Sequence, residues 1–95
     1  MKLYVLVFND YMGTQESVTA FLDSRKEVLN WCTVVPHSIL IVSEKSLADL
    51  TQLFSTTYPG RYFLLSEIQG FTSNGILQKS VWDFINNPKS SGRWQ

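Results

Sequence analysis

Hydrophobic positions along the chain gather in four short runs separated by polar segments. Residues 3–8 (LYVLVF) are apolar throughout and rich in aromatic and β-branched side chains, which is typical of a strand buried on both faces. Runs at 28–35 and 39–42 flank a break that contains proline, and this pattern predicts a β-hairpin. A fourth strand is expected over residues 61–68.

Three other segments have apolar residues at helical spacing. Thr14 is a predicted N-cap for a helix over residues 15–23, because its hydroxyl can accept a hydrogen bond from a free backbone amide of the first turn. Ser46 has the same role ahead of a second helix, which a Tyr-Pro-Gly sequence ends. Ser80 and Asp83 repeat the capping-box spacing, so a short third helix is expected from there.

The order of elements is therefore β-α-β-β-α-β with an additional short C-terminal helix. This order predicts an α+β fold of the ferredoxin-like kind, with a four-stranded antiparallel sheet and two helices on one face. Residues 1–88 would form the single domain, and residues 89–95 a flexible tail that is polar except for Trp94.

Composition narrows the possible functions. The 95 residues carry eight basic and eight acidic side chains, and this balance argues against a nucleic-acid coat or a polybasic membrane anchor. The longest N-terminal apolar run is too short for a signal-peptide core or a membrane span. One cysteine and one histidine cannot build a zinc site unaided. We expect a cytoplasmic protein with no membrane contact.

The predicted strands are apolar on both faces, whereas a sheet with helices on one face should be polar on the other. Either the C-terminal helix or a second copy of the chain must cover the remaining face, because monomers rarely expose so large an apolar area. A homodimer packed sheet on sheet is the favoured solution. The residues expected at the dimer face are Tyr4, Leu6, Phe8 and Trp82.

Few residues suggest catalysis. Asp10, just after the first strand, could help to hold Mg²⁺, although Asn9 and Asp10 also suit a simple Asx turn. Cys32 and His37 are a possible nucleophile and base, but nothing in their spacing enforces contact, so a core cysteine and a turn histidine are favoured.

A nucleic-acid surface is a weaker hypothesis. The basic residues that would form it are Arg61, Lys79 and Arg93, and nearby aromatic side chains such as Trp94 could stack on bases. Acidic residues are interleaved with them, so an ordinary solvated surface is favoured.

Three segments, YVLVFND (4–10), NWCTVVPHSILIVSE (30–44) and NGILQKSVWDFINNP (74–88), resemble small bacterial proteins of the SinR-like type. These are distant relatives of the CRISPR-associated adaptation endonuclease and the VapD toxin, and the resemblance implies a ferredoxin-like fold and a dimer. Nucleases of that superfamily carry an aspartate directly after the first strand, where this chain has Asn9. If any residue inherits the metal-binding role, it is Asp10.

Two functions follow as expectations. The favoured one is a self-associating, non-enzymatic interaction or regulatory protein without a cofactor, with an unknown protein partner. The alternative is an endoribonuclease of the toxin or CRISPR-associated type that uses Mg²⁺ bound at Asp10.

Overall fold

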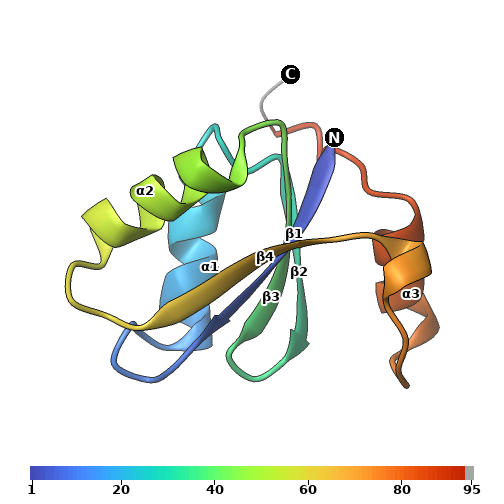
Figure 1. The fold of residues 1–95 in the computed structure, drawn as a ribbon, viewed down its shortest axis with the longest axis horizontal. Coiled ribbons are helices and arrows are strands. Elements are labelled where there is room, and N and C mark those ends of the chain that lie inside the picture. The colour runs from blue at the N-terminus through green and yellow to red at the C-terminus, as the bar shows by residue number, and fades with distance from the viewer. Residues whose placement is uncertain (94–95) are drawn as a thin grey trace.

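The protein, described here by a computed structural model over residues 1–93, is built on one four-stranded antiparallel sheet (Figure 1). The strands lie in the order β2-β3-β1-β4, so β2 and β4 form the two edges. The α+β class and the antiparallel four-stranded sheet are confirmed. In chain order the elements are β1 (Lys2–Phe8), α1 (Gln15–Asp23), β2 (Asn30–Val35), β3 (Ser38–Ser43), α2 (Leu47–Thr57), β4 (Phe63–Ile68), the 3₁₀ turn η1 (Gly70–Thr72) and α3 (Lys79–Asn86).

The central strand β1 fixes the register of the sheet. Val7 lies opposite Ser38 of β3 on one side and opposite Leu64 of β4 on the other. The end of β1, the β2–β3 hairpin turn and the beginning of β4 therefore meet at one end of the sheet. The turns at this end hold the polar residues considered below.

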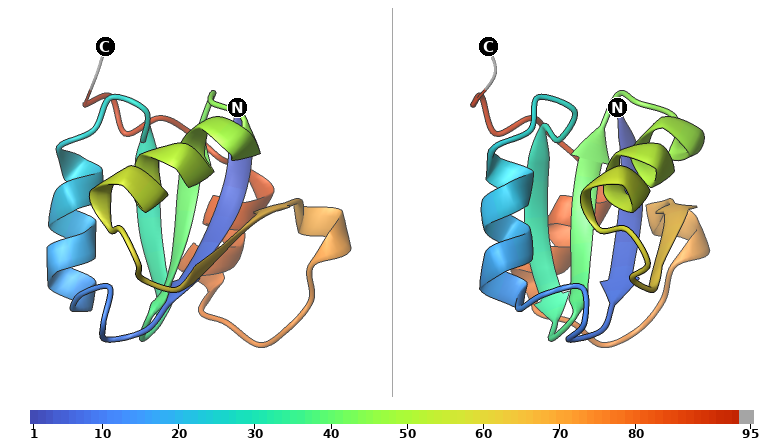
Figure 2. Two further views of the ribbon diagram at one scale, coloured as in Figure 1. Left: turned by 60° about the vertical axis from the view of Figure 1, so that its left-hand side comes forward. Right: turned by 90° about the vertical axis from the view of Figure 1, so that its left-hand side faces the viewer.

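Helices lie on both faces of the sheet. Figure 2 shows α1 and α2 over one face and α3 behind the other. The core beneath α1 and α2 contains three alternate residues of β1 together with apolar residues of both helices. Its buried members are Tyr4, Leu6, Phe8, Met12, Val18, Leu22, Val28, Ile39, Ile41, Leu50 and Phe54.

The second face is partly covered by the chain's own C-terminal helix. Val81 and Ile85 of α3 pack on Leu3, Leu40 and Val42 in a second buried cluster. The apolar residues of α3 recur at helical spacing, so they share one side of the helix and are buried against the apolar sheet. Coverage by the C-terminal helix, one of the two expected solutions, is thus present at this part of the sheet.

The prediction places the dimer-face residues of β1 on the wrong face of the sheet. Tyr4, Leu6 and Phe8 lie in the core beneath α1 and α2, where Leu6 has no exposed surface. Alternation along β1 sends Leu3, Val5 and Val7 to the opposite face instead. Both faces of β1 are apolar, so the sequence pattern gave no sign of which face the two crossover helices take.

The first two helix starts agree with their predicted caps. The Thr14 hydroxyl accepts a hydrogen bond from the Ser17 amide, and the Ser46 hydroxyl accepts one from the Asp49 amide, each at 3.1 Å. These bonds satisfy backbone donors that have no partner within the helix.

The predicted start of α3 at Ser80 is wrong. The helix begins at Lys79 after Gln78, whose carbonyl accepts from the Val81 amide at 3.0 Å. Asp83 forms an ion pair with Lys79 (2.9 Å) instead of capping the helix. Ser80 is the second residue of the helix, so it does not occupy the N-cap position that the Ser-x-x-Asp spacing predicts.

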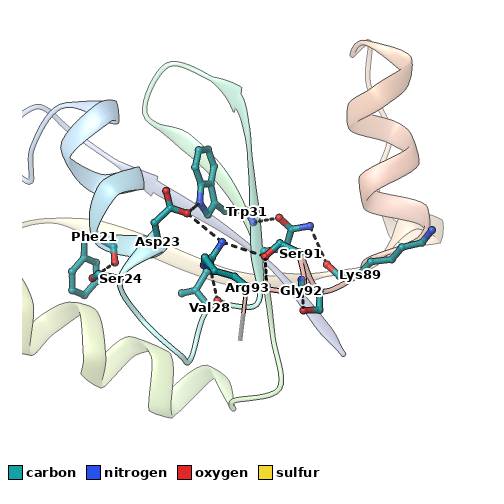
Figure 3. Close-up of polar contacts among 11 residues, drawn as sticks. Phe21, Asp23, Ser24, Val28, Trp31, Lys89, Ser91, Gly92 and Arg93 are labelled. Carbon is teal, nitrogen blue, oxygen red and sulfur yellow. Dashed lines mark hydrogen bonds and ion pairs between the residues drawn. The ribbon is translucent and has the colours of Figure 1, made fainter. Parts of the chain in front are cut away.

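The C-terminal segment lies against the beginning of β2 (Figure 3). Asn30 donates from its side-chain amide to the Lys89 carbonyl (3.0 Å), and the Ser91 amide donates to the Leu29 carbonyl (2.9 Å). Arg93 donates to the Val28 carbonyl (2.8 Å). Residues 89–93, part of the tail expected to be flexible, are thus hydrogen-bonded to the domain. Trp94 lies outside the described residues. No helix within residues 1–93 has the length and apolar character needed to cross a membrane.

Candidate functional site

The chain leaves β1 through an Asx turn. The Asn9 side-chain oxygen accepts a hydrogen bond from the Tyr11 amide (3.1 Å), and the Asn9 carbonyl accepts one from the Met12 amide (3.1 Å). Asparagine favours such turns because its side chain can replace a backbone acceptor. The turn predicted for Asn9 and Asp10 is confirmed, and it presents the Asp10 side chain, 87% exposed, to solvent.

His37 is positioned by contacts with two other elements. Its amide donates to Gln15 Oε1 of α1 (2.5 Å), and its carbonyl accepts from the Phe8 amide (3.1 Å). Its ring lies edge-to-face with the Phe8 ring, with centroids 5.4 Å apart. The backbone of His37 has a positive φ of 66°, which non-glycine residues seldom adopt.

These two turns bring Asp10 and His37 together. His37 Nε2 lies 2.5 Å from Asp10 Oδ1, although the residues are 27 positions apart. A carboxylate in this place orients the imidazole ring through its Nε2 atom. The Asp10 carboxylate is open to water, so solvent largely screens its Coulomb attraction to His37.

The structure does not bring Cys32 to this pair. Cys32 packs with the cluster on the α3 face, and its thiol contacts the Thr33 carbonyl (3.5 Å). Burial raises the pKa of the Cys32 thiol, which disfavours the nucleophilic thiolate. The favoured prediction of a packed cysteine and a turn histidine agrees with this geometry.

A metal at Asp10 would need further ligands. Within residues 1–93, no three His, Cys, Asp or Glu side chains gather into a group that could hold a metal ion. Asp10 and His37 would supply two donors, and water, substrate phosphate or a second chain would have to supply the others.

The same end of the sheet carries an apolar surface that α3 does not cover. We call Val7, Tyr62 and Leu64 the uncovered strip: their exposed fractions are 42%, 82% and 63%. Val7 and Leu64 are direct neighbours across β1 and β4. Together with Phe8, Asn9 and Phe63 they line a shallow hollow. The sequence predicted an apolar second face but not which part of it α3 would leave open.

The three basic residues proposed for nucleic-acid binding lie on separate parts of the fold. Arg61 lies in the α2–β4 turn, Lys79 at the start of α3 and Arg93 in the C-terminal segment (Figure 1). Lys79 is paired with Asp83, and Arg93 with Asp23 at 3.2 Å. These residues therefore do not form one continuous basic surface.

Arg93 instead belongs to a polar cluster that the sequence did not suggest. Asp23 Oδ1 accepts from the Trp31 indole (2.7 Å) and pairs with Arg93, which also reaches the Val28 carbonyl (Figure 3). The cluster joins α1, β2 and the C-terminal segment. Trp82, the fourth predicted dimer-face residue, is half-buried and packs beside the α3-face cluster.

Comparison of the chain with protein-family models, curated proteins and solved structures gave no match. The resemblance to SinR-like proteins thus stays a prediction.

Proposed function

We propose that the protein is a small, non-enzymatic interaction module that associates with a second copy of itself. The observation that carries this proposal is the uncovered strip, Val7, Tyr62 and Leu64, exposed at one end of a sheet face whose other end is buried by α3. Three neighbouring exposed apolar side chains, at the end of β1 and the beginning of β4, favour association over solvation.

Charge and composition are in keeping with this proposal. The net charge is zero, so self-association meets no strong long-range repulsion. We further infer a cytoplasmic protein of the SinR-like type with a ferredoxin-like fold. The strand order β2-β3-β1-β4 and the two crossover helices on one face support that fold.

The test is the molar mass in solution, measured by light scattering over a wide range of protein concentrations. The wild-type protein is expected to pass from monomer to dimer, and Leu64→Glu should remain monomeric because it places a carboxylate within the uncovered strip. The matched control is Leu47→Glu, an exposed leucine at the start of α2 on the opposite side of the sheet. Leu47→Glu should dimerise like the wild type.

A wild-type protein that stays monomeric to millimolar concentration would overturn the proposal. So would a dimer that Leu64→Glu and Leu47→Glu affect equally.

The second candidate is the metal-dependent endoribonuclease. The observation that favours it is the exposed Asp10 carboxylate beside His37 at a strand end. Asp10 would contribute a ligand to Mg²⁺, and His37 could carry a proton at the same place. It predicts Mg²⁺-dependent RNA cleavage by the pure protein that Asp10→Ala abolishes. Cleavage that survives Asp10→Ala would point to a contaminant or another site.

A further inference from the structure

We propose that the second copy binds by adding its β4 to β4 of the first, antiparallel, about a two-fold axis at Leu64. The two four-stranded sheets would then form one eight-stranded sheet. This inference rests on the proposed self-association and specifies the surface and the register through which it occurs.

The β4 edge is the more open of the two edges. At the β2 edge, the C-terminal segment bonds to Leu29 and Asn30 at the start of the strand. Among the described residues, no backbone hydrogen bond outside the sheet ladder involves 63–68. This strand has six residues and lacks the lysine or proline that commonly protects an edge from pairing.

The direction of the free backbone groups follows from the sheet register. The Phe8 amide donates to the His37 carbonyl, so the backbone groups of Phe8 point toward β3. Because these groups alternate along a strand, those of Val7 point toward β4 and bond with its partner Leu64. The β4 residues whose backbone groups point to the open edge are Phe63, Leu65 and Glu67.

A two-fold axis at Leu64 uses these outward groups for pairing between the copies. Leu64 then meets Leu64 of the second copy as a non-hydrogen-bonded pair, whose Cα atoms come within about 4.5 Å. Leu64 and Val7 from each copy form a continuous apolar band on the uncovered face. The other opposite pairs, each occurring twice, are Phe63 with Leu65, Tyr62 with Ser66 and Arg61 with Glu67.

Charge complementarity selects this register. Arg61 and Glu67 are both exposed and carry opposite charges; Glu67 lies in β4, and Arg61 lies two residues before the strand begins. An axis at Leu65 would place Glu67 opposite Phe63, and an axis at Ser66 would place it opposite Leu65. Only the axis at Leu64 pairs charge with charge and apolar with apolar, and such cross-strand pairs stabilise a sheet.

The first experiment reverses these charges. Arg61→Glu or Glu67→Arg alone should raise the dimer dissociation constant about tenfold, because each puts like charges opposite one another at two places. The double variant should return to within about threefold of the wild-type value. Lys79→Glu is the matched control, since it makes the same charge change on α3, and it should leave the dissociation constant unchanged.

The second experiment tests the register by disulfide formation in a Cys32→Ser background. Leu64→Cys should give a covalent dimer on mild oxidation, because the two thiols face each other across the axis. Ser66→Cys lies on the same face but should not cross-link. Cross-linking of Ser66→Cys in preference to Leu64→Cys would overturn the register.

The outcomes separate this inference from the proposed function. A protein that is monomeric at every concentration tested would overturn self-association itself. In another outcome, Leu64→Glu abolishes the dimer, but the charge reversals leave the dissociation constant unchanged and Leu64→Cys forms no cross-link. That outcome supports self-association and overturns pairing through β4. Rescue in the charge-reversed double variant together with the Leu64→Cys cross-link supports it.

Discussion

His37 Nε2 lies 2.5 Å from Asp10 Oδ1, which joins the β2–β3 hairpin to the turn that follows β1. The two residues lie in exposed turns, yet the Phe8 amide and the Gln15 side chain hold the backbone of His37 in place. The positive φ of His37 is therefore maintained by contacts on both sides of the turn.

The hairpin should tolerate asparagine at position 37 much better than valine. A β-branched residue at φ 66° is strained by about 1–2 kcal/mol, whereas asparagine adopts this conformation readily. In urea denaturation, His37→Val should be clearly less stable than His37→Asn. Asp10→Ala, which removes the ion pair alone, should lose less than about 1 kcal/mol because the pair is solvated. Equal stability of the two His37 variants would show that the turn does not hold a positive φ.

Truncation should destabilise the protein far more at Leu6 than at Leu64, although both are strand leucines. Leu6 is fully buried beneath α1 and α2, so Leu6→Ala should lower the free energy of unfolding by about 2–5 kcal/mol. Leu64 is largely exposed, so Leu64→Ala should lower the free energy of unfolding of the monomer by less than about 1 kcal/mol. Urea denaturation at low protein concentration measures both. A large loss in Leu64→Ala under those conditions would mean that the strip is buried within the monomer.

The element order and the helix caps at Thr14 and Ser46 could be predicted from the sequence, because local periodicity and capping chemistry determine them. The face taken by the crossover helices could not. Tyr4, Leu6 and Phe8 are no more apolar than Leu3, Val5 and Val7, and the choice depends on tertiary packing.

The contact between Asp10 and His37 could be predicted from the strand order, but not from the separation of the two residues in the sequence. In the expected strand order, the first strand and the third are neighbours, so the end of the first strand lies beside the hairpin turn. The Asp23–Trp31–Arg93 cluster gave no such signal. It depends on where the chain goes after α3, and no periodic pattern follows Pro88.

The Arg93 contacts should stabilise the start of β2. Arg93→Ala removes the ion pair with Asp23 and the hydrogen bond to the Val28 carbonyl, and should lower the free energy of unfolding by about 1–3 kcal/mol. Hydrogen exchange should rise in a peptide spanning 28–35. Lys79→Ala is the control: it breaks an exposed pair with Asp83 and should change stability by less than about 0.5 kcal/mol. Unchanged exchange in Arg93→Ala would show that the C-terminal segment does not support β2.

Glu27 should contribute to a loss of stability in acid. The Arg25 side chain hydrogen-bonds to Glu27 and holds the pKa of that carboxyl below its usual value. Its stabilising contribution is present above the unfolded-state pKa and is lost as pH falls through the lower folded-state pKa. Unfolding free energies measured from pH 6 to pH 3 should fall less steeply in Glu27→Gln than in the wild type. Parallel curves would assign the acid sensitivity to other carboxyl groups.

Cys32 should react slowly in the folded protein. Burial raises the pKa of its thiol, so less thiolate is present at a given pH, and residues of α3 such as Trp82 pack in the same cluster. Alkylation by iodoacetamide at pH 8 should be at least about tenfold slower in native protein than in urea. Ser55→Cys in a Cys32→Ser background places a thiol on the exposed surface of α2 and should react at the same rate in both conditions. If native Cys32 reacted as fast as this surface thiol, α3 would not hold its place on the sheet in solution, and the uncovered strip would extend over the whole second face.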